Sequence, residues 1–156
     1  MTKRYDSMAS RAPKVGDFVW CNFPFREKPQ HPAEAMHAVY ILATKGDTAV
    51  AAIYTTTALP KPTQPKSPYT IAISEDASRK MGMTRPFTID SSRVAFLPIN
   101  EAFFPGADNG KVPIIGQADD RLQRAIESRL EAAVHGNHLE TLGPRQVRSL
   151  FMRPFG

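Results

Sequence analysis

The chain has 156 residues, of which 42% are hydrophobic and 22% charged, with a formal net charge of +5 at pH 7. This length fits one domain and the composition is globular, and no window holds the roughly 18 consecutive apolar residues that span a bilayer. The single cysteine, Cys21, excludes an intrachain disulfide and a cysteine-based metal site. We expect Cys21 to pack as a small apolar side chain.

The N-terminal residues 1–13 are basic and polar, and they lack the apolar segment of a secretory signal. They predict a flexible tail on a cytoplasmic protein that makes no contact with membranes. The positive net charge favours a polyanionic partner, because lysines and arginines attract phosphates. Many basic proteins bind no nucleic acid, so charge alone does not identify the partner.

Strand patterns dominate the chain after this tail. A first strand lies within residues 15–25, where aromatic and β-branched residues follow one another until Pro24 limits it. Residues 38–57 predict a hairpin of two apolar strands around a tight glycine turn. Between them, residues 25–36 are rich in charge and proline and predict a loop. Loops of this length in a compact domain are often functional.

The middle of the chain continues with short elements. Four prolines in residues 58–68 predict an extended surface connection. Residues 69–74 alternate between apolar and polar side chains and predict a strand. Residues 74–83 predict one helical turn that ends at Gly82, and residues 87–99 supply one or two further strands.

The last third changes from irregular to helical. Residues 100–116 carry glycine and proline at turn positions. In residues 119–135 apolar side chains recur at intervals of three and four, which predicts one amphipathic helix that stops at Gly136. Residues 137–156 leave two interpretations open: a short helix at 144–151, or a segment that orders only on a partner.

Five or six short strands followed by one amphipathic helix predict a mainly-β fold, a small and strongly bent barrel with the helix packed on it. We expect the barrel domain to cover residues 14–136. It follows the tail of residues 1–13 and precedes a C-terminal extension, residues 137–156.

The order of these features resembles the MazF/PemK family of toxin endoribonucleases. A GD dipeptide opens an aromatic strand, a long polar loop follows, and then come the AVYIL and AVAAIYT strands. The glycine of MGMTRPFTIDSSRVAFLPI and the closing helix also fall where that family has them, so that the resemblance covers residues 14–135. It implies an SH3-like β-barrel, usually a homodimer, that cleaves single-stranded RNA without a metal or cofactor. It also implies a cognate antitoxin that blocks the groove.

The sequence departs from the family at the two catalytic positions. The family has an arginine, commonly as Arg-Pro, before the second strand, and this position falls on His37, which Ala38 follows. The family's threonine or serine at the end of the third strand falls on Tyr54 or, with a shift of one residue, on Thr55.

RNA cleavage without a metal needs a base for the 2′-hydroxyl, an acid for the leaving oxygen, and a cation or donors for the phosphorane charge. His37 is a candidate, because a histidine with a pKa near 6.5 can act as acid or base near neutrality. The alternative is that His37 only bonds a backbone carbonyl. Thr55 is a candidate to bond a phosphate oxygen. Arg26 is the first candidate for a displaced catalytic arginine, because loop residues can fold over a groove.

Four further residues are candidates for substrate binding. Tyr54 and Phe25 offer aromatic faces on which unpaired bases stack. Lys28 and His31 lie in the same long loop and can reach the groove. Each also fits plain packing or a solvated loop. A second basic cluster either follows the RNA backbone or faces water: Arg79, Lys80 and Arg85.

The sequence contains no motif for other kinds of catalytic or metal site. There is no glycine-rich phosphate loop and no HExxH motif, and His135 and His138 have no further ligands beside them, so we expect no metal. The leading hypothesis is therefore a metal-independent endoribonuclease of a toxin–antitoxin module. One alternative is a catalytically inactive barrel that binds nucleic acid or a peptide in the same groove. Another is an interaction protein that docks through its C-terminal segment.

Overall fold

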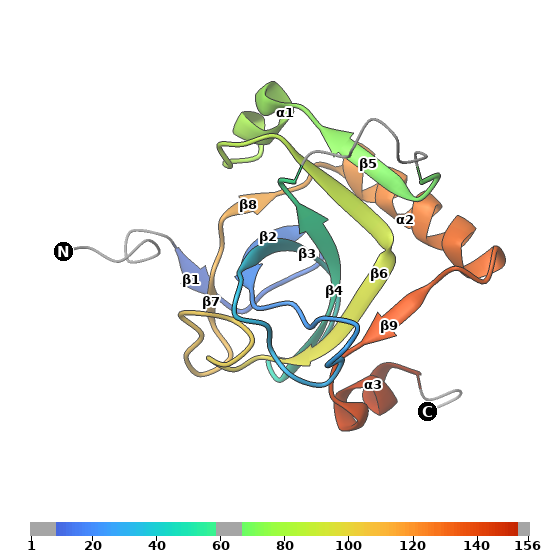
Figure 1. The fold of residues 1–156 in the computed structure, drawn as a ribbon. Coiled ribbons are helices and arrows are strands. Elements are labelled where there is room, and N and C mark those ends of the chain that lie inside the picture. The colour runs from blue at the N-terminus through green and yellow to red at the C-terminus, as the bar shows by residue number, and fades with distance from the viewer. Residues whose placement is uncertain (1–8, 59–66, 153–156) are drawn as a thin grey trace.

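A strongly curled, seven-stranded sheet organises the protein, as Figure 1 shows. The structure is a computed structural model, which describes residues 9–58 and 67–152. The strand order is β5-β6-β4-β3-β2-β8, and β9 pairs with β6 outside this path. The strands are β2 (Asp17–Cys21), β3 (His37–Lys45), β4 (Ala49–Thr56), β5 (Thr70–Ile73), β6 (Phe87–Pro98), β8 (Gly116–Gln117) and β9 (Glu140–Leu142). The predicted mainly-β class and small barrel are confirmed.

The central hairpin of β3 and β4 is buried on both faces. Tyr40 and Ile53 lie in one core cluster, whereas Val39 and Ala52 lie in another on the opposite face of the sheet. A strand buried on both faces is a continuous apolar run, which explains the AVYIL and AVAAI segments. The predicted hairpin is confirmed.

Helices cover the outside of the sheet. The structure describes three: α1 (Glu75–Lys80), α2 (Asp120–His135) and α3 (Arg145–Met152). Asp119 caps α2, since its carboxylate accepts a hydrogen bond of 2.8 Å from the backbone N–H of Leu122. The buried residues of α2 are Ile126 and Ala133, and both α2 and α3 pack against β6. The predicted long helix and the predicted short helix near the C-terminus are both confirmed.

None of the helices in the described part of the chain is long and apolar enough to cross a membrane. The predicted proline-rich connection, residues 58–68, falls mostly outside the described residues. Two short strands, β7 (Val112–Pro113) and β8, interrupt the segment that the sequence predicts to be irregular.

A short strand near the N-terminus packs residues 10 and 11 against the barrel domain. Strand β1 (Ser10–Arg11) pairs with β7 in a separate two-stranded sheet, although the sequence predicts a flexible tail there. Residues 1–8 of that tail lie outside the described residues. The Arg11 guanidinium donates two hydrogen bonds, of 2.7 and 2.8 Å, to the carboxylate of Asp17.

Asp17 is fully buried and holds the start of β2. Its carboxylate also accepts hydrogen bonds from the backbone N–H of Lys14, at 2.8 Å, and from the Gln117 amide, at 3.2 Å. Burial raises the pKa of the Asp17 carboxyl, but the bonds from Arg11, Lys14 and Gln117 outweigh it and hold the pKa below its ordinary value. The aspartate of the GD dipeptide therefore has a structural role.

Candidate functional site

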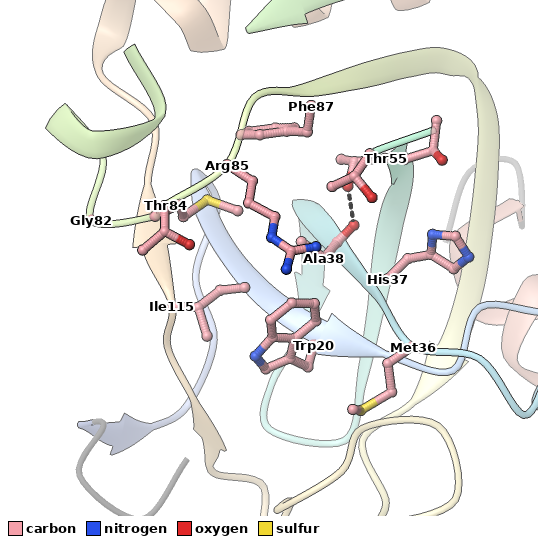
Figure 2. Close-up of a pocket in the computed structure, with 13 residues that line it drawn as sticks. Trp20, Met36, His37, Ala38, Thr55, Gly82, Thr84, Arg85, Phe87 and Ile115 are labelled. Carbon is pink, nitrogen blue, oxygen red and sulfur yellow. Dashed lines mark hydrogen bonds between the residues drawn. The ribbon is translucent and has the colours of Figure 1, made fainter. Parts of the chain in front are cut away.

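A pocket of about 450 Å³ opens where β3 begins and β4 ends. Val39 pairs with Tyr54 across these antiparallel strands, so residues before Val39 and after Tyr54 meet at the same end of the sheet. The loop between α1 and β6 closes the opposite side. Figure 2 shows the lining residues, of which Trp20, His37, Thr55, Arg85 and Phe87 carry the chemistry or the aromatic surface.

His37 is half-buried at the first position of β3, and it lines the pocket. Its ring lies against Tyr54, with 4.9 Å between the ring centroids and an interplanar angle of 50°. Burial lowers the pKa of His37, a hydrogen bond to the Thr55 backbone opposes this, and the charge of Arg93 lowers the pKa further. The net effect holds the pKa of His37 below its ordinary value, which favours a proton acceptor over a permanent cation.

Thr55 also lines the pocket, but it is 2% exposed and its hydroxyl donates a hydrogen bond to the Ala38 carbonyl. A hydroxyl has one proton to donate. While Ala38 accepts that proton, Thr55 has none for a phosphate oxygen. The bond instead joins the end of β4 to the residue that follows His37.

Arg85 supplies the cation of the pocket. It follows the turn after α1, and Figure 2 shows it extending from the wall with Phe87 toward Trp20 and Ala38. The ion pairs and side-chain hydrogen bonds of the described residues leave Arg85 without a partner. Its exposed guanidinium can therefore bind an incoming anion.

The loop between β2 and β3 contributes less to the pocket than the sequence predicts. Arg26 does not line it, because its Nε forms an ion pair of 2.5 Å with Glu140. Phe25 is 52% exposed and also lies outside the lining. Lys28 and His31 are exposed, and a backbone hydrogen bond of 3.2 Å from His31 to Lys28 joins them within the loop.

Tyr54 lies behind His37 rather than in the pocket lining. Its other neighbours are Phe23, at 5.2 Å between ring centroids, and the Arg93 guanidinium, at 3.9 Å from the Tyr54 centroid. This ring therefore supports the imidazole and is not free to stack on a base.

The second basic cluster is divided by the fold. Arg79 faces solvent on α1 and pairs with Glu75 at 3.4 Å, whereas Arg85 reaches the pocket. Sequence reasoning gave no role to Trp20 or Phe87, which form aromatic walls beside Arg85. Among the described residues there is no group of three histidine, cysteine or acidic side chains that could hold a metal ion.

Comparison with known proteins adds a likeness of fold. No protein-family model and no curated protein matches the chain. An endoribonuclease from a mycobacterial species, solved in complex with its cognate antitoxin, is 14% identical with a TM-score of 0.51, over 80% of this chain and 96% of its own. Another mycobacterial endoribonuclease is 13% identical with a TM-score of 0.49, over 80% of this chain and 93% of its own. The chain therefore shares its fold with a solved endoribonuclease.

Proposed function

We propose that this protein is an endoribonuclease that cleaves single-stranded RNA without a metal ion, as the toxin of a toxin–antitoxin pair of the MazF/PemK type. One observation carries the proposal: one pocket is lined both by His37, whose pKa is lowered by burial, and by Arg85, which has no ion-pair partner among the described residues. The fold that holds them is similar to that of an endoribonuclease. The histidine can move a proton, and the arginine can neutralise a phosphate.

The reaction needs the RNA, the pocket and a proton from the solvent. Neutral His37 accepts the proton of a 2′-hydroxyl, whose oxygen attacks the adjacent phosphorus. Arg85 binds the non-bridging oxygens and stabilises the extra negative charge of the phosphorane. The bond to the 5′-oxygen then breaks, and this oxygen takes a proton from the solvent in the open pocket. The products are a 2′,3′-cyclic phosphate and a 5′-hydroxyl.

The remaining lining residues position the catalytic groups and the substrate. Thr55 holds the Ala38 carbonyl and so fixes the strand end beside His37. Trp20 lines the pocket from β2 and offers its indole to the unpaired bases of single-stranded RNA, whereas Phe87 is 6% exposed and packs on Phe18 in the core. Stacking of this kind is available in single strands and not in a closed duplex, which supports the choice of substrate.

Two partners belong to the same proposal. A cognate antitoxin binds over the pocket and keeps RNA out, as the structural similarity to an antitoxin-bound endoribonuclease suggests. The active form is a homodimer. Co-expression with the product of a neighbouring reading frame, followed by light scattering of the free and bound protein, tests both partners.

The direct test is incubation of the purified protein with mixed single-stranded RNA in a chelator, over about pH 5 to 9. We expect fragments with cyclic phosphate and 5′-hydroxyl ends. His37→Gln abolishes them and leaves RNA binding intact, and His135→Gln, at the exposed end of α2, serves as the control. RNA binding with no fragments at any pH would instead support the catalytically inactive barrel.

A further inference from the structure

An irregularity in β6 lies beside Tyr54, the residue of β4 whose ring contacts His37. Strand β4 pairs with β6 at Ile53 and Val94, but the next pair is Tyr54 and Asp90, so residues 91–93 have no partner on β4. Bulges of this kind are common next to active sites, where they redirect a side chain. The side chain redirected here belongs to Arg93.

Arg93 contacts the rings of Tyr54 and Phe23, and none of these three residues lines the pocket. Its guanidinium carbon lies 3.9 Å from the centroid of the Tyr54 ring and 5.7 Å from that of Phe23, and the side chain is only 19% exposed. A guanidinium above an aromatic face is a cation–π contact, which strengthens when water is excluded. Arg93 is therefore held in one place against Tyr54.

Strand β9 anchors this arginine. Its first residue, Glu140, pairs with Arg93 in a parallel register, and Figure 1 shows β9 lying along β6. The carboxylate of Glu140 lies 3.6 Å from Nε of Arg93 and 2.5 Å from Nε of Arg26. One carboxylate thus offsets two guanidinium groups, and these three side chains together carry a net positive charge.

Tyr54 connects this charge to the pocket. The Tyr54 centroid lies 4.9 Å from the His37 ring and 3.9 Å from the Arg93 guanidinium, which places the guanidinium within about 9 Å of the imidazole. The charged and titratable groups near His37 and its neighbour Tyr54 are Cys21 on β2, Arg26 in the following loop, Tyr54 on β4, Arg85 across the pocket, Asp90 and Arg93 on β6, and Glu140 on β9.

We propose that Arg93 is a positioning residue for the nuclease: stacked on Tyr54 and anchored by Glu140, it holds the His37 imidazole at the pocket wall in its neutral, proton-accepting form. This inference rests on the proposed function. The charge of Arg93 disfavours a second positive charge on His37, and Glu140 limits that effect. The lowered pKa of His37 agrees with this arrangement.

The test is an NMR titration of the His37 ring, assigned among the four histidines by a His37→Gln variant. Coulomb's law over about 9 Å, with an effective dielectric constant between about 80 and 20, gives a shift of about 0.3 to 1.4 pH units. Arg93→Met therefore raises the titration midpoint, and Glu140→Gln lowers it. Cleavage activity should fall at acidic pH as His37 becomes protonated. For each variant, the pH at which this fall occurs shifts in the same direction as the NMR titration midpoint.

Opposite shifts separate this proposal from a general loss of structure, which would move both variants alike. Arg93→Lys keeps the charge and moves the titration midpoint less than Arg93→Met. If Arg93→Met does not fold, Arg93→Lys and Glu140→Gln are compared with wild type instead. Arg129→Met removes a charge from the exposed face of α2 and leaves the midpoint unchanged. Equal midpoints in wild type, Arg93→Met and Glu140→Gln would overturn the inference. The titration needs no cleavage, so its outcome is independent of whether the nuclease proposal holds.

Discussion

Replacement of Arg85 by methionine tests the assignment of charge stabilisation most directly. Arg85 lines the pocket from the loop before β6, and the interactions of the described residues leave its guanidinium unpaired. Methionine keeps an unbranched side chain of similar reach but removes the charge and the donors. Because Arg85 is exposed and supports no core contact, the variant should fold as the wild type does.

The expected loss follows from electrostatics. A phosphorane carries one more negative charge than the phosphodiester, and a unit charge at about 4 Å with an effective dielectric constant of about 20 contributes about 4 kcal/mol. Removing one donor from sites of this kind lowers kcat by about 10²- to 10³-fold. The open, solvated position of Arg85 weakens the field, so we expect a loss of about 10²-fold for Arg85→Met. Arg85→Lys, which keeps the charge but not the forked donors, should lose about tenfold.

The assay is initial-rate cleavage of a fluorescent single-stranded RNA, with binding measured separately at several salt concentrations. Loss of one phosphate contact should reduce the slope of log K against log salt by about 0.7. Arg79→Met, an exposed arginine paired with Glu75, is the control and should stay within about twofold of wild type. Full activity in Arg85→Met together with a large loss in Arg26→Met would refute the reasoning and restore Arg26 as the site's arginine.

Three further substitutions test structural roles. Thr55→Val should lower the free energy of unfolding by about 1 kcal/mol, as measured by urea denaturation, whereas Thr55→Ser should match wild type. Asp17→Asn should cost about 2 kcal/mol at pH 7. Since the folded pKa of Asp17 is depressed, wild type should lose this stability as pH falls below about 4, and a variant curve with the same acid slope would contradict the assignment. Gly143→Ala, whose Cβ would lie 2.0 Å from the Phe96 carbonyl oxygen at φ +107°, should lose about 3 kcal/mol or more, but Gly46→Ala, with nothing within 4 Å, about 1 kcal/mol.

Periodicity and turn chemistry were sufficient to predict most of the fold. The hairpin of residues 38–57 and the helix of residues 119–135 both depend on local patterns, which the structure confirms. The short strands β1, β7 and β9 depend instead on partners far along the chain, such as Arg93 for Glu140. Two- and three-residue strands carry too little pattern to be predicted before their partners are known.

Only the part of the candidate site that the β3–β4 hairpin forms could be predicted from the sequence. His37 and Thr55 meet because paired strands begin and end together, and both line the pocket. Arg85 comes from a loop some distance along the chain, and its position depends on how α1 and β6 close the barrel. A local signal was present, since Arg85 and Pro86 form an Arg-Pro dipeptide directly before an apolar strand, although before β6 and not β3.

In the proposed mechanism, proton transfer and charge stabilisation belong to different elements of the fold, His37 on β3 and Arg85 in the loop before β6. An arginine at position 37 would be a permanent cation, but a half-buried histidine with a lowered pKa is poorly suited to hold the phosphorane charge. A pocket with such a histidine therefore needs its cation from another element, and Arg85 lies on the opposite wall. Because an arginine stays protonated at every working pH, the activity of this arrangement should depend on the ionisation of His37 alone. The ionisation of His37 should in turn respond to the residues connected to it: Tyr54 contacts His37, Arg93 in the bulge of β6 contacts Tyr54, and Glu140 of β9 pairs with Arg93.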